Sequence, residues 1–405
     1  MITKEEIERL ANVKIIKKGG DFYCGHLNLY GKKNITELPN NLNVLGYLNL
    51  CYSSVTKLPK GLDVELWMSI SGTNIEELPE DAKIGGSLDI NGMKKPFLFP
   101  NIVKVNGRFN CSNTTIKHMP EELYVSERCD FSYSIFNKLP NVMEVGDSLC
   151  LAGASITELP ESINEVYGDF NLCNTKISKL PNNLVTYNDL FLNGTPITEL
   201  SKGLIVGGKL YLYNTILKNY SNLHKHCSKF QVTNEKYEEI KNSLGEHSKR
   251  NLWGDDILVT FEPNYNGAYL FENESGKYIK ADGIFGKIVE QKGDVYHVKL
   301  SKSEEISYLV TDGNGYWVHD YTLDKAKDEL IFINNKKNKD DYWGLTLKSE
   351  LSFEDAIMCY RVITNESKHI NSVFEKNKKD RYTIKEIIKI TKGEYGGRIF
   401  RSFFL

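Results

Sequence analysis

Apolar residues return along the first half of the chain at fixed distances from a recurring proline. Counted from each proline, they stand three and five positions on, and again nine and eleven positions on, as in Leu48 and Leu50. Alternation at nine and eleven predicts a half-buried strand in every unit. The prolines are separated by 20 or 21 residues and are Pro39, Pro59, Pro79, Pro100, Pro120, Pro140, Pro160 and Pro181. So constant a period predicts a stacked solenoid.

The repeating unit reads L-P-x-x-L-x-V-x-G-x-L-x-L-x-x-T-x-I-x-x. It resembles the leucine-rich repeat, in the short bacterial form that carries one Leu-Pro pair per unit, from Leu27 to about Leu217. The resemblance implies a horseshoe with a parallel sheet. The residue before a proline is extended, so we expect the convex side to be extended or 3-10 helical.

One position departs from that family. Its members usually carry Asn where this chain has Thr or Ser, as at Thr73, Thr114 and Ser134. A hydroxyl can donate to a neighbouring carbonyl and accept from an amide. We therefore expect a hydroxyl ladder in place of the Asn ladder.

Four regions are predicted along the chain. Residues 1–34 form an N-terminal cap helix, begun by a Thr3–Glu6 capping box, and a first partial repeat. Residues 35–217 form the repeats, and 218–255 form a helical cap or linker. Residues 256–405 form a smaller α+β domain, because the composition changes there to short aromatic and β-branched runs.

The second domain is predicted to begin as an antiparallel meander and to end in helices. Gly-containing turns separate the short runs between 268 and 319, which is typical of hairpins. Helices are expected at 322–333, at 353–363 behind Ser352, at 384–390 behind a Thr383–Glu386 capping box, and at 395–404.

The C-terminal half also resembles the uncharacterised domains that follow leucine-rich repeats in proteins of gut bacteria and their phages. The resemblance is carried by the runs 352–357 and 382–388, and it implies no established activity. Bacterial ubiquitin-ligase effectors with such repeats use a Cys-x-Asp motif. Here Tyr360 and Arg361 follow Cys359, so that activity is not implied.

Composition and charge narrow the class of protein. The chain has 405 residues and a formal net charge of −2, which argues against non-specific binding to DNA or anionic membranes as its main role. Its charged start lacks the apolar run of a Sec signal. Cysteines without C-x-x-C spacing, two of them at the inward positions Cys111 and Cys129, favour reduced thiols. We therefore expect a cytoplasmic protein of a bacterial host or a phage-infected cell, with export by another route left open.

No cofactor or metal is predicted. His224, His226 and Cys227 invite a metal interpretation, but two His at i and i+2 do not share a helix face and no fourth ligand lies nearby. A solvated helix end is the favoured interpretation of this cluster.

A binding surface follows from the register of the strands. If the Leu positions point inward, the residues between them point to the concave face. Exposed Trp, Tyr and Arg are typical of interface hot spots, and aromatic residues gather at the two ends of this face. The candidate partner-binding residues are Tyr47, Trp67, Asp89, Arg108, Arg128, Asp130, Asp189, Phe191, Tyr211 and Tyr213.

The predicted function is that of a non-catalytic protein-binding module. The resemblance to phage and gut-bacterial proteins favours an effector or inhibitor that blocks a host or defence protein. One alternative is a nucleic-acid-associated protein that uses the basic tail at Lys376, Lys378, Lys379 and Arg381, although a solvated face is the simpler interpretation of these charges. Another is an enzyme with an unrecognised activity in the C-terminal domain.

Overall fold

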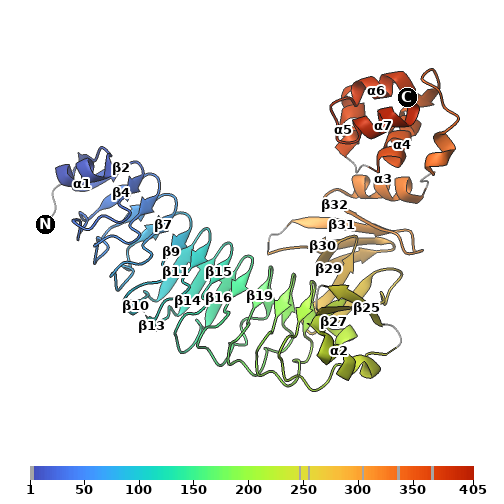
Figure 1. Ribbon diagram of the computed structural model, residues 1–405. Helices are drawn as coiled ribbons and strands as arrows, with labels where there is room; N and C mark the ends of the chain where they lie inside the picture. Colours follow the sequence, from blue (N-terminus) through green and yellow to red (C-terminus); the bar gives the residue numbers. More distant parts are fainter. Residues whose placement is uncertain (1–3, 246–247, 254–255, 303–304, 335–337, 366–368) are drawn as a thin grey trace. The chain divides into compact units, whose positions relative to one another are not determined.

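The computed structural model describes residues 4–245, 248–253, 256–302, 305–334, 338–365 and 369–405 (Figure 1). The chain divides into two compact units. The first, here called the solenoid unit, comprises Met1–Val289 and Val298–Ile306. The second, the C-terminal unit, comprises Glu290–His297 and Ser307–Leu405.

One strand from each repeat joins a long parallel sheet in the solenoid unit (Figure 1). Its parallel strands are β3 (Leu27–Asn28), β5 (Leu48–Asn49), β7 (Met68–Ser69), β9 (Leu88–Asp89), β12 (Phe109–Asn110), β15 (Cys129–Asp130), β17 (Leu149–Cys150), β19 (Phe170–Asn171), β21 (Leu190–Phe191), β23 (Leu210–Tyr211) and β24 (Lys229–Thr233). The predicted β-solenoid with a parallel sheet is confirmed.

The predicted register is confirmed as well. Leu149 pairs with Phe170, and Phe170 pairs with Leu190, so the extra residue in that repeat is absorbed outside the strand. The side chains of all three are at most 1% exposed. They belong to a core that runs through the stack from Ile7 to Phe261.

The return segments carry shorter parallel sheets and are extended. Their strands are β2 (Asp21–Cys24), β4 (Leu42–Val44), β6 (Asp63–Val64) and β8 (Lys83–Ile84); β11 (Ile102–Val105), β14 (Glu122–Val125) and β16 (Val142–Val145); β18 (Glu165–Val166), β20 (Val185–Thr186) and β22 (Ile205–Val206); and the pair β10 (Phe97–Leu98) and β13 (Ile116–His118). Strand β1 (Ile16–Lys18) pairs antiparallel with β2. Most of these strands begin a few residues after a Leu-Pro pair and are stabilised by pairing with the equivalent segment of the next repeat.

A hydroxyl ladder stabilises the turns that follow the strands of the long sheet. The Thr73 hydroxyl donates to the carbonyl of Ile70 at 2.7 Å. The Thr114 hydroxyl donates to the carbonyl of Ile90 at 2.9 Å and accepts from the amide of Met93 at 3.4 Å. The bonding expected of these hydroxyls, to a carbonyl and from an amide, is therefore confirmed.

An N-terminal helix covers the first repeats. Helix α1 (Lys4–Ala11) contributes Ile7, which is 1% exposed, to the core of the solenoid. Such a helix covers the apolar edge that the first repeat of any solenoid leaves open. The capping box expected at Thr3 and Glu6 begins outside the described residues.

The far end of the long sheet differs from the predicted helical cap. Between 218 and 255 the structure has the turns η1 (Leu223–Lys225) and η2 (Lys241–Ser243), the short helix α2 (Asn234–Ile240), and two strands, β24 and β25 (Ser248–Trp253). Phe230, expected on a helix, lies on β24 and is buried. The prediction is wrong for β24 because the last repeat leaves a row of unpaired backbone groups, which a further strand can pair and a helix cannot. It is wrong for β25 because that strand pairs with β26 (Asp256–Phe261). Strands β26 and β25 then close the sheet in antiparallel fashion.

Strands β27 (Tyr269–Asn273) and β28 (Gly276–Ala281) pack on the side of the last repeats. Tyr278 and Phe285 form an apolar cluster with Val185, Tyr187 and Ile205. The Tyr278 hydroxyl donates to Glu165 at 2.9 Å. Residues 256–289 thus belong to the solenoid unit, and the division of the structure lies later in the chain than the change in composition at 256.

The expected short runs form antiparallel pairs. Strand β28 pairs with both β27 and β29 (Ile284–Lys292), and β31 (Ile306–Thr311) pairs with β32 (Trp317–Asp320). The residues of β29 and of β30 (Val295–Lys299) are divided between the two units.

The C-terminal unit ends in helices. These are α3 (Leu323–Asn334), α4 (Phe353–Thr364), α5 (His369–Lys376), α6 (Ile384–Ile390) and α7 (Gly397–Phe404), with the turn η3 (Lys339–Tyr342) before α4. The expected caps at Ser352 and at Thr383 with Glu386 are confirmed. Each capping residue is the last residue of a short strand, and these strands, β33 (Glu350–Ser352) and β34 (Arg381–Thr383), pair antiparallel. Within the described residues, none of the helices is long and apolar enough to span a bilayer.

Candidate functional site

The candidate surface is the outer face of the long sheet, formed by the side chains that alternate with the buried Leu positions. Leu48 and Leu50 are fully buried, whereas Tyr47 and Asn49 are half-buried and point away from the core. The same alternation places all ten predicted partner-binding residues on or beside this face. Whether they bind a partner remains a prediction.

An aromatic stack lies at the N-terminal end of the outer face. The rings of Tyr47 and Trp67 are parallel within 4°, with centroids 4.5 Å apart. The His26 ring stacks on the other side of Tyr47, also at 4.5 Å. Trp67 is 39% exposed, so the stack ends in an accessible indole. The repeats generate this stack because they place one side chain directly above the next at each step of the sheet.

A second aromatic cluster lies at the C-terminal end of the outer face. Phe191 and Tyr211 stack at 4.4 Å, and the Lys209 ammonium lies 5.1 Å from the Tyr211 ring and 5.2 Å from the ring of Trp253. The Tyr213 hydroxyl donates to Asp256 at 3.0 Å. Burial and the Asp256 carboxylate raise the pKa of Tyr213. Tyr213 is thus tied to the closing strand β26, while Trp253 is 60% exposed and extends the cluster.

Small polar residues fill the middle of the face and cap the strands. The Asp89 carboxylate accepts from the amide of Asn91 at 3.1 Å, and the Asp130 carboxylate accepts from the amide of Ser132 at 2.9 Å. Asn28, Asn49, Asn110 and Asn171 accept from the amide two residues on in the same way. Asp89 and Asp130 therefore have a structural role in the turns, which their spacing alone did not indicate.

Two arginines project from the middle of the face. Arg108 pairs with Glu127 at 3.1 Å, with side chains 75% and 53% exposed. Arg128 pairs with Asp130 at 3.0 Å, and its side chain is 52% exposed. Ion pairs this exposed contribute at most about 1 kcal/mol, so both guanidinium groups can exchange partners at little cost.

The acids near the C-terminal cluster are engaged with backbone amides. The Asp189 carboxylate accepts from the amide of Lys209 at 2.7 Å, and the Asp169 carboxylate accepts from the amide of Asp189 at 3.1 Å. Burial, together with the neighbouring carboxylates of Asp189 and Asp147, raises the pKa of Asp169. Asp189 is half-buried and holds the backbone of the next strand, in addition to facing outward as expected.

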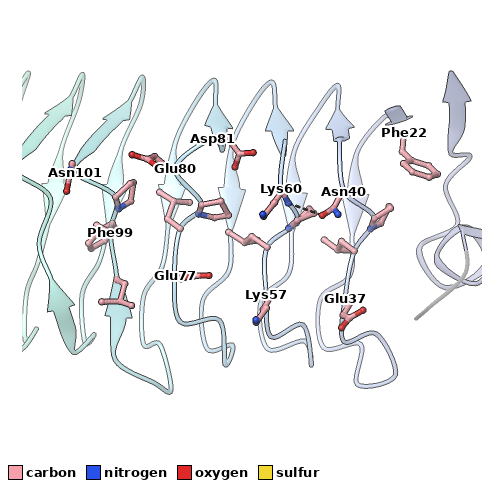
Figure 2. A pocket seen from close by; sticks show the side chains of 18 of the residues that line it. Phe22, Glu37, Asn40, Lys57, Lys60, Glu77, Glu80, Asp81, Phe99 and Asn101 are labelled. Atoms are coloured by element: carbon pink, nitrogen blue, oxygen red, sulfur yellow. Dashed lines mark hydrogen bonds between the residues drawn. The ribbon is translucent and has the colours of Figure 1, made fainter. Parts of the chain in front are cut away.

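Figure 2 shows a groove on the side of the solenoid that carries the Leu-Pro pairs. This groove has a volume of about 990 Å³ and is floored by Leu38, Leu58, Leu78 and Phe99 with the prolines that follow them. Ile7 and Phe22 line it as well. Its rim carries charges of both signs, including Glu37, Lys57 and Glu77 in one row (Figure 2). The repeated Leu-Pro pairs could have indicated this groove from the sequence.

The cluster of His224, His226 and Cys227 forms no metal site in the structure. The ring of His226 is hydrogen-bonded to the carbonyl of Leu204 at 2.9 Å, and Cys227 is buried. Burial lowers the pKa of His226. Across the described ranges, no group of three or more His, Cys, Asp or Glu side chains could hold a metal ion.

Three of the four predicted tail cations are paired. Lys378 contacts Glu375 at 3.3 Å, Lys379 contacts Glu386 at 2.7 Å, and Arg381 contacts Glu350 at 3.2 Å. These side chains therefore form exposed ion pairs, as the solvated-face interpretation expects. Of the aromatic residues interleaved with them, Tyr382 and Phe400 are buried in the core of the C-terminal unit.

Comparison with known proteins adds no relative. No protein-family model, no curated protein and no solved structure matches this chain.

Proposed function

We propose that this chain is a repeat protein that binds a folded protein partner through the outer face of its long sheet, without catalysing a reaction. The observation that carries the proposal is the arrangement of that face. Accessible aromatic groups gather at its two ends, and exposed arginines stand between them.

The spacing of the two clusters suits a protein-sized ligand. Six strand steps separate Trp67 on the loop before β7 from Phe191 on β21, which is about 29 Å at about 4.8 Å per step. A standard protein interface buries about 800 Å² on each partner. A small molecule could reach one cluster, whereas a folded domain could contact both clusters and the arginines together.

The chemistry of the face favours binding over catalysis. Asp89, Asp130 and Asp189 already accept hydrogen bonds from backbone amides, so they are held as structural acceptors. Trp, Tyr and Arg are the residue types that most often dominate binding energy at interfaces. We expect Trp67, Tyr211 and Arg108 to supply most of the affinity.

We propose further that the solenoid is a leucine-rich repeat and that the chain is a cytoplasmic effector or inhibitor that blocks a host or defence protein. This finer version is supported by the Leu-Pro period, which resembles that of short bacterial leucine-rich repeats. It is also supported by the resemblance of the C-terminal half to domains in proteins of gut bacteria and their phages.

The proposal is tested by comparing variants in a capture experiment. The immobilised wild-type chain and the variant Trp67→Ala/Arg108→Ala/Arg128→Ala are incubated with bacterial lysate, and bound proteins are quantified by mass spectrometry. We expect a protein enriched by the wild type to be lost at least tenfold with the triple variant. Its melting temperature should stay within a few degrees of the wild-type value, because exposed substitutions usually change stability by less than about 0.5 kcal/mol each.

The matched control is Lys57→Ala/Lys60→Ala/Glu77→Ala, at the rim of the Leu-Pro groove. It removes three exposed side chains from the other side of the same repeats and should leave capture unchanged. Capture that survives the face variant and is lost with the groove variant would assign binding to the groove instead.

A further inference from the structure

The C-terminal unit contains a basic groove between α6 and α7, of about 590 Å³. Lys385 and Lys389 stand one helical turn apart on α6, and Lys392 follows that helix. Arg398 and Arg401 line the other wall from α7. Side chains at i and i+3 or i+4 share a helix face, so each helix directs its cations to the same side.

The turn between the helices brings the two walls together. A Cβ atom on Gly397 would lie 2.1 Å from the carbonyl oxygen of Thr391, so any other residue would push α7 away from the end of α6. The buried Thr391 hydroxyl donates to the carbonyl of Ile387 at 2.8 Å and fixes that end of α6. The groove is therefore a consequence of the close packing of α6 and α7.

Five cations line this groove. Within the described residues, none of the side chains of Lys385, Lys389, Lys392, Arg398 and Arg401 forms an ion pair. Glu386 also lines the groove, but its carboxylate contacts Lys379 and accepts from the amide of Thr383 at 2.9 Å. The groove thus concentrates positive charge on a chain whose net charge is −2, and the occupant that compensates it must be anionic.

An exposed aromatic residue lies in the turn that joins the two helices of the groove. Tyr395 is 89% exposed and lies two residues before Gly397, in the turn that joins the two helices. A row of cations beside an accessible ring is the combination that binds single strands, because the cations contact phosphates and the ring stacks on an unpaired base.

We propose that the α6–α7 groove binds the phosphate backbone of a single-stranded nucleic acid, with Tyr395 stacking on a base. An anionic membrane is a weaker fit, because cations on two facing walls suit a strand that lies between them better than a plane. The site uses none of the residues of the outer face, so the two sites can be tested with separate variants.

The test is fluorescence anisotropy of the full chain with fluorescein-labelled oligothymidine and oligouridine. We expect micromolar dissociation constants at about 50 mM salt. We also expect log K to fall with log[salt] with a slope of about −3, if four or five phosphates are contacted at about 0.7 each. Lys389→Glu/Arg401→Glu should weaken binding at least tenfold. Tyr395→Ala should weaken it about fivefold or more without changing the slope, and Tyr395→Phe should restore it.

The matched control is Lys325→Glu/Lys327→Glu on α3, which makes the same change in net charge in the same unit at exposed positions. It should change affinity less than twofold, and circular dichroism should show that all variants are folded. Equal losses in the groove and control variants, or no binding to the oligonucleotides at 50 mM salt, would overturn the proposal. Binding to phosphatidylserine vesicles but not to oligonucleotides, lost in Lys389→Glu/Arg401→Glu, would assign the groove to membranes.

Discussion

The solenoid and the C-terminal unit satisfy their buried polar groups in different ways. In the repeats, a hydroxyl at one fixed position bonds a backbone carbonyl in turn after turn, as at Thr73 and Thr114. In the C-terminal unit, the guanidinium of Arg361, 5% exposed, pairs with Glu329 and lies 3.5 Å from the ring centre of Phe332. A repeated site can use a neutral donor because a backbone carbonyl recurs within its reach, in the same turn for Thr73 and in the preceding turn for Thr114. A site that occurs once can depend on a charge pair between two helices.

This comparison predicts that introducing a buried charge within the repeats lowers the free energy of unfolding more than any other change considered below. Leu149→Asp places a carboxylate at a position that is 1% exposed. Its neighbours on the adjacent strands, Cys129 and Phe170, carry no positive charge. We expect a loss of about 5 kcal/mol or more, since the cavity left by the leucine adds to the cost of burying the charge. Chemical denaturation followed by circular dichroism measures it. Arg108→Ala on the outer face should cost under about 0.5 kcal/mol. Equal stability of the two variants would mean that the inward and outward faces are reversed.

Breaking the charge pair of the C-terminal unit should have the next largest effect. Arg361→Ala leaves the Glu329 carboxylate, whose side chain is 12% exposed, without its cation. We expect a loss of about 3–5 kcal/mol in the unfolding of this unit. The double variant Arg361→Met/Glu329→Leu removes both charges and should recover most of that loss. If the double variant is no more stable than the single one, packing and not the unpaired charge explains the effect.

Removing one hydroxyl of the ladder should lower the free energy of unfolding by a smaller amount. Thr114→Val keeps the shape of the side chain but leaves the carbonyl of Ile90 without its donor in a buried site. We expect a loss of about 1–2 kcal/mol. Thr114→Ser retains the hydroxyl, and urea denaturation should place it between the wild type and the valine variant. A stable valine variant would show that the ladder contributes no net stability.

Lys280 is a buried charge outside the repeating pattern. Its contribution to the free energy of unfolding should be the smallest of these effects and should depend on pH. The ammonium of Lys280 on β28 donates to the carbonyl of Gly207 and, at 2.9 Å, to the hydroxyl of Ser228. Burial lowers the pKa of Lys280 to about 8. The folded chain therefore releases this proton near pH 8 while the unfolded chain retains it, so the free energy of unfolding should rise with pH above that value.

The measurement is the melting temperature at pH 7.5 and at pH 9.5 for the wild type and for Lys280→Met. Other groups that titrate in this range contribute to both proteins and cancel in the difference. We expect the wild type to gain a few degrees relative to the variant as the pH rises. A constant difference between the two proteins would show that Lys280 keeps its proton in the fold.

The period of the sequence predicted the solenoid because every turn repeats the same contacts with its neighbour. Strand positions, inward residues and the shift at Phe170 all follow from counting along the chain. The helices behind Ser352 and Thr383 could also be predicted, because capping is a local interaction. The strands at 229–233 and 248–253 could not, because they form by pairing with other strands: the first with the last repeat, and the second with β26.

The candidate surface divides in the same way. Alternation placed Tyr47, Trp67 and Arg108 on the outer face, but it did not indicate that Asp89 and Asp130 cap the turns. The sequence shows the basic residues of the tail as one group. In the described structure, Lys378 and Lys379 form ion pairs, whereas the cations that line the α6–α7 groove do not. Pairing depends on which helices pack together, and that is absent from the order of residues.

By itself, the sequence determined the stacked repeats, which side chains of the repeat strands point into the core, and where the capped helices begin. These features depend on contacts between residues at fixed or short separations. Tertiary structure decided how the last edge is closed, that Tyr278 and Lys280 pack against the repeats, and that Arg361 pairs with Glu329. It also decided which cations of the described residues form ion pairs. The physical reason is that these contacts join residues with no fixed separation, so their energies exist only once the chain has folded.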